Sequence, residues 1–149
     1  MIAVPKLLPA DYRSRIQMRS KRGHKERELE VPGQDNGHYR LILRQSNSNT
    51  LAFSIILAVN PSDSNQLFRL RRYNGKNHEH TNTIEGDTFY DFHIHQATER
   101  YQESGAREDT FAEPTDRYAD FHTALRCMFE DCGFQAPSEA QNLFGEPGL

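Results

Sequence analysis

Four of the seven histidines lie within 18 residues and form two His-x-His pairs, His78 with His80 and His93 with His95. Side chains two residues apart in an extended strand point to the same face, so each pair presents two imidazoles together. If the two segments lie side by side, all four imidazoles would line one patch. Imidazole exchanges protons near neutral pH and is the commonest metal ligand in proteins. The pattern therefore predicts acid–base chemistry or metal binding at this patch.

A metal-free ribonuclease is the first function that this pattern fits. Of His93 and His95, one could take the proton of a ribose 2′-hydroxyl while the other, protonated, gives a proton to the leaving oxygen. His78 or His80 would assist, and Tyr101 would orient the phosphate. No cofactor is expected in this interpretation. The cationic side chains predicted to bind the phosphate and to stabilise the charge that develops on it are Arg71, Arg72, Lys76 and Arg100.

Two other functions are alternatives to the ribonuclease, and a third alternative is that the histidines have no function. A metal-dependent enzyme would bind zinc, iron or nickel through His78, His80, His93 and His95. A non-catalytic interaction protein, such as an antitoxin, an immunity factor or a phage-encoded inhibitor, would bind a cognate protein partner instead. Histidines on a polar strand face are also common without any function.

The charges are divided unevenly along the chain. Residues 1–75 contain 13 lysines and arginines against 6 acidic residues, whereas residues 76–149 contain 5 against 15. A basic segment attracts phosphates even where the net charge is slightly negative, as it is here at −3, which favours RNA as a partner. The acidic half would suit a basic protein partner.

Length and composition limit the remaining function classes. The 149 residues suit one domain, and no apolar run approaches the roughly 20 residues that cross a bilayer. The chain starts without the pattern of a secretory signal, so we expect a cytoplasmic protein with no membrane partner. Cys127 and Cys132 are too few for a disulfide scaffold and are predicted to be buried small hydrophobic residues. Phosphate-binding glycine loops, serine-hydrolase elbows and zinc-protease motifs are absent from the sequence.

The elements that must position these residues are mainly strands. A short helix is predicted after Pro9, extending toward Gly23, and a second over residues 116–131, capped by Thr115. Alternating and apolar runs predict strands at 27–31, 38–44, 51–59, 67–73 and 89–95.

In the last of these strands, Tyr90, Phe92 and Ile94 should face the core, and Asp91, His93 and His95 the other side. The sum is an α+β fold, with an antiparallel sheet of four to six strands and one or two packed helices. We expect a single domain over residues 1–134 and a loosely docked or flexible tail over 135–149.

A resemblance is carried by RYNG at 72–75, HEHTN at 78–82, FHIH at 92–95 and ERY at 99–101. Over residues 66–125 the chain resembles small uncharacterised bacterial and prophage domains that share the two His-x-His pairs. More distantly, it is similar to TumE-type toxin components of toxin–antitoxin modules, small α+β proteins thought to act on RNA. The resemblance implies a mobile-element or conflict-system context and an activity directed at RNA.

Overall fold

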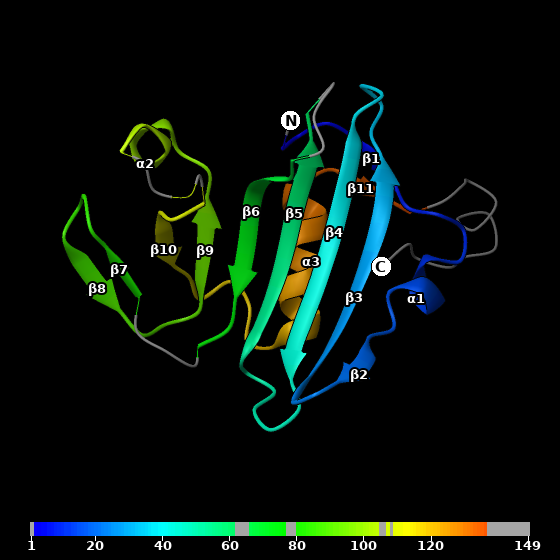
Figure 1. The fold of residues 1–149 in the computed structure, drawn as a ribbon. Helices are drawn as coiled ribbons and strands as arrows, with labels where there is room; N and C mark the ends of the chain where they lie inside the picture. The colour runs from blue at the N-terminus through cyan, green and yellow to red at the C-terminus, as the bar shows by residue number, and fades with distance from the viewer. Residues whose placement is uncertain (1, 62–65, 77–79, 105–106, 108, 137–149) are drawn as a thin grey trace.

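A seven-stranded antiparallel sheet runs through the molecule, and α3 (Phe121–Asp131) covers one of its faces (Figure 1). The computed structural model describes residues 2–61, 66–76, 80–104, 107 and 109–136. In spatial order the strands are β10 (Ala112–Pro114), β9 (His93–Gln96), β6 (Phe68–Asn74), β5 (Phe53–Asn60), β4 (His38–Ser46), β3 (His24–Pro32) and β2 (Arg19–Lys21).

Two small sheets and two short helices complete the described residues. β7 (His80–Asn82) pairs antiparallel with β8 (Asp87–Phe89), and β1 (Lys6–Leu7) pairs parallel with β11 (Phe134–Gln135). The short helices are α1 (Tyr12–Arg15) and α2 (Glu99–Glu103). The predicted α+β class, an antiparallel sheet with packed helices, is confirmed. Short β2 and β10 lie at its two edges, beyond the strands that the sequence predicts.

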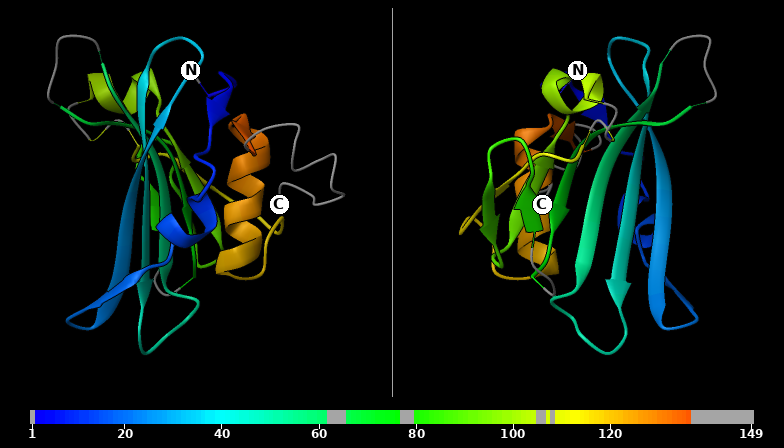
Figure 2. Two further views of the ribbon diagram at one scale, coloured as in Figure 1. Left: turned by 90° about the vertical axis from the view of Figure 1, so that its right-hand side faces the viewer. Right: turned by 60° about the vertical axis from the view of Figure 1, so that its left-hand side comes forward.

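Alternation along the strands decides which face is covered. Leu41 and Leu43 of β4 lie opposite Leu57 and Ile55 of β5, and all four are almost completely buried. Branched and aromatic residues fit such a pleated, half-buried surface, which explains why these segments form strands. Figure 2 shows α1 and α3 on the same side of the sheet, where they close the core. The opposite face of the sheet is left to polar side chains and to the β7–β8 hairpin.

The helix α3 begins later than the sequence predicts. Thr115 is not its cap, because Asp120 accepts a hydrogen bond from the Thr123 N–H at 2.8 Å and forms a capping box. The segment before it is held by the sheet instead. Tyr118 donates from its hydroxyl toward the backbone oxygens of Asn74 and His93, at 2.8 and 3.0 Å. This contact needs an extended approach to the sheet, which a helix starting at residue 116 would not give.

The predicted strand over residues 89–95 is divided in two. β8 ends at Phe89 because it belongs to the hairpin with β7, whereas β9 starts at His93 because it pairs with β6. The chain changes partners between these strands. Tyr90, predicted to face the core, is therefore 55% exposed. Ile94 does join the core, as predicted.

Two further predictions about local structure are wrong. The first helix ends at Arg15 rather than near Gly23, and the chain goes on into β2, which pairs antiparallel with β3. α2 occupies residues 99–103, where the sequence analysis predicts no helix. Both elements are only three to five residues long, and such short pieces carry little periodicity from which to predict them.

Lys6 joins the two small strands β1 and β11 to the core. Its side chain is fully buried, and Nζ donates to the backbone oxygens of Ile2, Val4 and Cys132 at 2.7–2.8 Å. The ammonium also lies 4.6 Å from the ring centroid of Tyr39. Burial lowers the pKa of Lys6, and the three carbonyls supply the hydrogen bonds that a buried ammonium requires.

Most of the predicted tail, residues 135–149, lies outside the described residues, the last of which is residue 136. Gln135, predicted to begin it, belongs to β11. Within the described part of the chain, none of the helices is long and apolar enough to cross a membrane.

The capping box provides a test of where α3 starts. Asp120→Ala should lower the free energy of unfolding by about 1 kcal/mol, because it leaves the Thr123 N–H without its acceptor. Asp116→Ala, at the start that the sequence predicts, should change it by less than about 0.5 kcal/mol. Urea denaturation followed by circular dichroism measures both. A larger loss for Asp116→Ala than for Asp120→Ala would contradict this helix start.

Candidate metal centre

The register of β6 and β9 places two histidines on the sheet face opposite α3. His95 lies across from Arg72, and His93 lies across from Asn74. Ile94, between them, points into the core, so the alternation predicted for this strand is observed. Both histidines are nevertheless buried, since His93 is 0% exposed and His95 is 3% exposed.

The β7–β8 hairpin covers this face and brings a third histidine. The His80 ring stacks on His93 with centroids 5.3 Å apart and meets the edge of His95 at 4.8 Å. Phe89 of β8 packs against both His80 and His93. One nitrogen of each of the three histidines lies within 4.8 Å of the others. His80, His93 and His95 are referred to below as the histidine cluster.

Backbone oxygens fix the tautomers of two rings in the cluster. Nδ1 of His93 lies 2.8 Å from the backbone oxygen of Asp91, and Nδ1 of His95 lies 2.8 Å from that of Asp109. A carbonyl only accepts, so each Nδ1 carries the hydrogen and each neutral ring keeps its lone pair on Nε2. The amide nitrogen of Asn74 lies 3.4 Å from Nε2 of His93, consistent with an acceptor there.

Asn82 fixes the tautomer of His80. Its amide donates to the backbone oxygen of Ala112 at 2.6 Å, and its Oδ1 accepts from the Ala112 N–H at 2.9 Å. These two bonds determine which end of the amide is oxygen. The same Oδ1 lies 2.9 Å from Nε2 of His80, so Nε2 donates and the lone pair of His80 lies on Nδ1.

The histidine cluster has the donor set of a metal centre. Each ring gives its one N–H to an oxygen acceptor outside the cluster, an arrangement that orients and tunes histidine ligands in metal sites. Three neutral imidazoles match catalytic zinc sites that keep a fourth position open. Tetrahedral zinc with Zn–N near 2.0–2.1 Å holds its nitrogens about 3.3 Å apart, so the rings would close by up to about 1.5 Å.

His95 is held neutral by its surroundings. The pKa of His95 is lowered to about 2, mainly by burial and further by the nearby Arg72 and the other two histidines. The hydrogen bond to the Asp109 oxygen opposes the shift only in part. A neutral ring is the form that binds metal, and it cannot donate the proton that a ribonuclease acid requires.

A shallow pocket opens beside the cluster, with a volume of about 320 Å³. Its lining combines two of the cluster histidines with arginines and small polar residues: Ser54, Arg72, Asn74, His80, His95, Arg107, Asp109 and Thr110. The Asp109 side chain is fully buried beneath this pocket. Burial and repulsion from Arg107 and Arg69 lower the pKa of Arg72, and the Asp109 carboxylate opposes this.

A bulge in the sheet collects the arginines around Asp109. The register between β5 and β6 shifts between Leu57 and Ala58, which lie opposite Arg71 and Arg69. The extra residue puts Arg69 and Arg72, three apart, on the same face. Their Nε atoms lie 3.4 and 3.8 Å from the carboxylate of Asp109. Bulges often re-aim side chains in this way near functional sites.

Of the residues predicted to be catalytic, the structure brings His80, His93 and His95 together. His78 lies outside the described residues. Tyr101 is buried but does not line the pocket, since its hydroxyl donates to Glu85 at 2.7 Å and accepts from the Ile84 N–H at 3.0 Å. It ties α2 to the loop between β7 and β8, which is a structural role.

The three predicted phosphate ligands whose side chains the structure describes do not act as one group. Of these three, only Arg72 lines the pocket. Arg71, next to it in β6, points to the α3 side and lies 3.8 Å from Asp131. Lys76 lies over the Phe92 ring at 5.2 Å, beside a different hollow. The side chain of Arg100 lies outside the described residues.

Three contributors to the site were not predicted: Asn82, Asp109 and Arg107. Asn82 stands two residues after His80, at the spacing that places both on one face of a strand, so its position was a usable signal. Asp109 and Arg107 lie in a stretch without periodicity and reach the site only through the tertiary fold. Comparison of the chain with protein-family models, curated proteins and solved structures finds no match.

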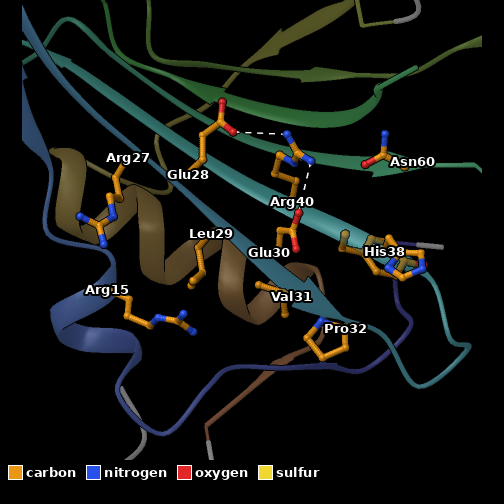
Figure 3. Close-up of a pocket in the computed structure, with 11 residues that line it drawn as sticks. Arg15, Arg27, Glu28, Leu29, Glu30, Val31, Pro32, His38, Arg40 and Asn60 are labelled. Carbon is orange, nitrogen blue, oxygen red and sulfur yellow. Dashed lines mark hydrogen bonds and ion pairs between the residues drawn. The ribbon is translucent and has the colours of Figure 1, made fainter. Parts of the chain in front are cut away.

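A second hollow, of about 430 Å³, lies over β3 and β4 and contains none of the predicted site residues (Figure 3). Its central cation, Arg40, lies 3.4 Å from both Glu28 and Glu30. Arg15 and Arg27 also line this hollow, but Arg40 is paired with two carboxylates and the histidine cluster lies elsewhere. Arg40 is therefore a suitable control for arginine variants of the candidate site.

The neutral state of His95 predicts a loss of stability in acid. In the metal-free protein the free energy of unfolding should fall by about 2 kcal/mol from pH 7 to pH 5 because of this residue. The unfolded chain binds a proton below about pH 6.5, whereas folded His95 does so only near pH 2, so stability present above pH 6.5 is lost on acidification.

Urea denaturation with a chelator present measures this effect. His95→Gln should remove that part of the fall, and His122→Gln, at an exposed position of α3, should retain it. An equal fall in the wild type and in His95→Gln would show that His95 is not held neutral.

Proposed function

We propose that this protein is a metal-dependent hydrolase in which His80, His93 and His95 bind one divalent transition ion, zinc foremost. One observation carries the proposal: three imidazoles converge while each gives its N–H to an oxygen outside the cluster. The three rings therefore lie close together in the orientation that second-shell acceptors give to histidine ligands. A metal ion is the partner that this arrangement best fits.

A hydrolytic role follows from the ligand set. A zinc ion bound by three neutral ligands keeps its full charge and can supply hydroxide near neutral pH. The residues of the chain perform the other tasks. Asn82 and the two backbone oxygens hold the rings in position, Phe89 shields them, and the pocket admits a substrate beside His80 and His95.

The metal-free ribonuclease that the sequence suggests is less well supported by this geometry. It needs one histidine that is charged and one that is neutral at the working pH. His95 stays neutral, and His93 lies fully buried with Nδ1 bonded to a carbonyl. We propose RNA as the substrate on the basis of the basic first half of the chain, and we propose that the protein works in the cytoplasm. The two free, buried cysteines suit a reducing compartment.

Metal binding is the direct test. Protein purified without a histidine tag should bind one equivalent of Zn²⁺, and Co²⁺ should give the absorption spectrum of a tetrahedral site. Asn82→Ala should weaken zinc binding by about 10- to 100-fold, because His80 loses the acceptor that orients it. Thr81→Ala, the adjacent exposed position in β7, should leave the affinity unchanged. Isothermal titration calorimetry with competing chelator measures each value.

The histidines themselves supply the control. His80→Ala, at a half-buried position, should abolish stoichiometric binding, whereas His122→Ala should retain it. Zinc binding that persists at one equivalent in His80→Ala would overturn the assignment of the site.

Cleavage assays separate the two mechanisms. We expect the zinc-loaded protein to cleave RNA and the chelator-treated protein to lose this activity, with recovery when zinc is restored. Tyr101→Phe should retain activity, because its hydroxyl bonds Glu85 and Ile84 rather than the pocket. Cleavage that survives complete removal of metal, but not His95→Gln, would restore the metal-free histidine mechanism.

A further inference from the structure

We infer that the pocket beside the histidine cluster contains an oxyanion subsite, formed by Arg72 and Arg107, that binds one phosphate group of the substrate. The inference rests on the proposed function, since it names the part of the substrate that would lie next to the metal. It assigns a binding role to Arg107, which the sequence analysis did not single out. It also identifies phosphate as the chemical group that the pocket recognises.

The charges at the pocket do not balance. Arg72 and Arg107 share one carboxylate, that of Asp109, with Nε–oxygen distances of 3.8 and 3.1 Å. Arg69 is a third guanidinium on the same carboxylate at 3.4 Å. Among the described residues that line the pocket, Asp109 is the only acidic side chain, and the histidines there add no negative charge. Within this set, Arg72 and Arg107 therefore leave one positive charge in excess, which an anion would neutralise.

Arg72 also has hydrogen-bonding capacity to spare. Its Nε is buried and, among the described residues, has no hydrogen-bond acceptor, because the contact to Asp109 is too long for one. A buried donor without an acceptor is costly, and the forked guanidinium matches the oxygens of a phosphate. The neighbouring hydroxyls are already engaged, since Ser54 donates to Asn74 and Thr110 donates to the Arg107 backbone oxygen.

Arg72 lies next to the histidine cluster, so the subsite would hold its phosphate close to the proposed metal. Arg72 and His95 are direct partners across β6 and β9, so opposed residues on one face of the sheet carry the guanidinium and the imidazole. Directly opposed side chains in an antiparallel pair lie about 4.5–5.5 Å apart at Cβ. A phosphate held by Arg72 would thus lie within reach of a metal on the cluster. Asp109 serves both groups, because its carboxylate holds the arginines and its backbone oxygen holds His95.

Binding measurements on the zinc-loaded protein test this inference. The probes are a fluorescein-labelled single-stranded oligodeoxynucleotide, whose backbone presents the phosphodiester group, and inorganic phosphate as competitor. Arg107→Gln, at a half-exposed position, and Arg72→Gln should each weaken oligonucleotide binding at least about 10-fold. Each should also lower the slope of log K against log salt by about 0.7. Arg40→Gln, which removes the same charge from the same sheet face, should change binding less than about twofold.

Free phosphate and a phosphodiester within a nucleic-acid strand are the two ligands that this subsite could recognise, and they give different competition results. Displacement of the oligonucleotide by millimolar phosphate in the wild type, lost in Arg107→Gln, would support recognition of the phosphate group alone. Resistance to phosphate together with the same arginine effects would support recognition of a phosphodiester within a strand. Losses in Arg72→Gln and Arg107→Gln no larger than in Arg40→Gln would overturn the subsite for both sources.

Zinc stoichiometry distinguishes this inference from the proposed function. Arg72→Gln and Arg107→Gln should still bind one zinc ion, since neither residue belongs to the cluster. Zinc binding in the wild type without any arginine effect would overturn the subsite alone. Arginine effects in a wild-type protein that binds no zinc would overturn the metal function while leaving the anion subsite in place.

Discussion

The pairing of β6 with β9 is the constraint on which the site depends. Its register sets His93 and His95 across from Asn74 and Arg72 on the outer face of the sheet. A shift by one residue would turn both histidines into the core and Ile94 outward. The register is held from the opposite side, where the Tyr118 hydroxyl lies within 3.0 Å of the backbone oxygens of both strands. The packing of the core therefore determines the arrangement of polar groups on the other face.

Burial lowers the pKa of His95, and the acceptor of its N–H opposes this only in part because it is an uncharged backbone oxygen. His93 and His95 donate to backbone oxygens rather than to carboxylates, which would stabilise the charged ring. The nearest buried carboxylate, Asp109, is occupied by arginines instead. Neutral bases and cationic groups thus lie side by side without neutralising one another. This separation suits a site that uses a metal ion for activation and guanidinium groups for binding.

The part of the site that depends on local spacing could be predicted from the sequence. The period of two in a strand put His93 and His95 on one face with Ile94 on the other, and the structure agrees. The approach of His80 depends on a hairpin that folds back over the sheet, which spacing alone does not specify. Burial of the histidines and the role of Asp109 depend on contacts between distant segments, and no local pattern encodes them.

The same reasoning explains why some predictions about the strands were right and others wrong. The strand β4 was predicted from its run of strand-forming residues, and β5 because it is the most apolar segment and is rich in β-branched and aromatic residues. Tyr90 looked like a core residue because the alternation of β9 seemed to extend back to Phe89. It does not, because β8 and β9 have different partners and the chain must turn between them. A change of pairing partner leaves no trace in hydrophobic periodicity, so the boundary could only come from the tertiary structure.

The hydrogen bond that Lys6 makes to a distant backbone oxygen affects the order in which the chain can fold during synthesis. The Lys6 ammonium reaches the backbone of Cys132, 126 residues further along, and β1 pairs with β11, besides a single bridge from Lys6 to Gly33 next to β3. As the ribosome makes the chain, the pairing of β1 with β11 must therefore wait until nearly all of the described residues have emerged. Closing so long a loop is slow, and the buried ammonium gains its third carbonyl only at that point. The central strands can form their hairpins well before then, so docking of the first residues would complete folding rather than start it.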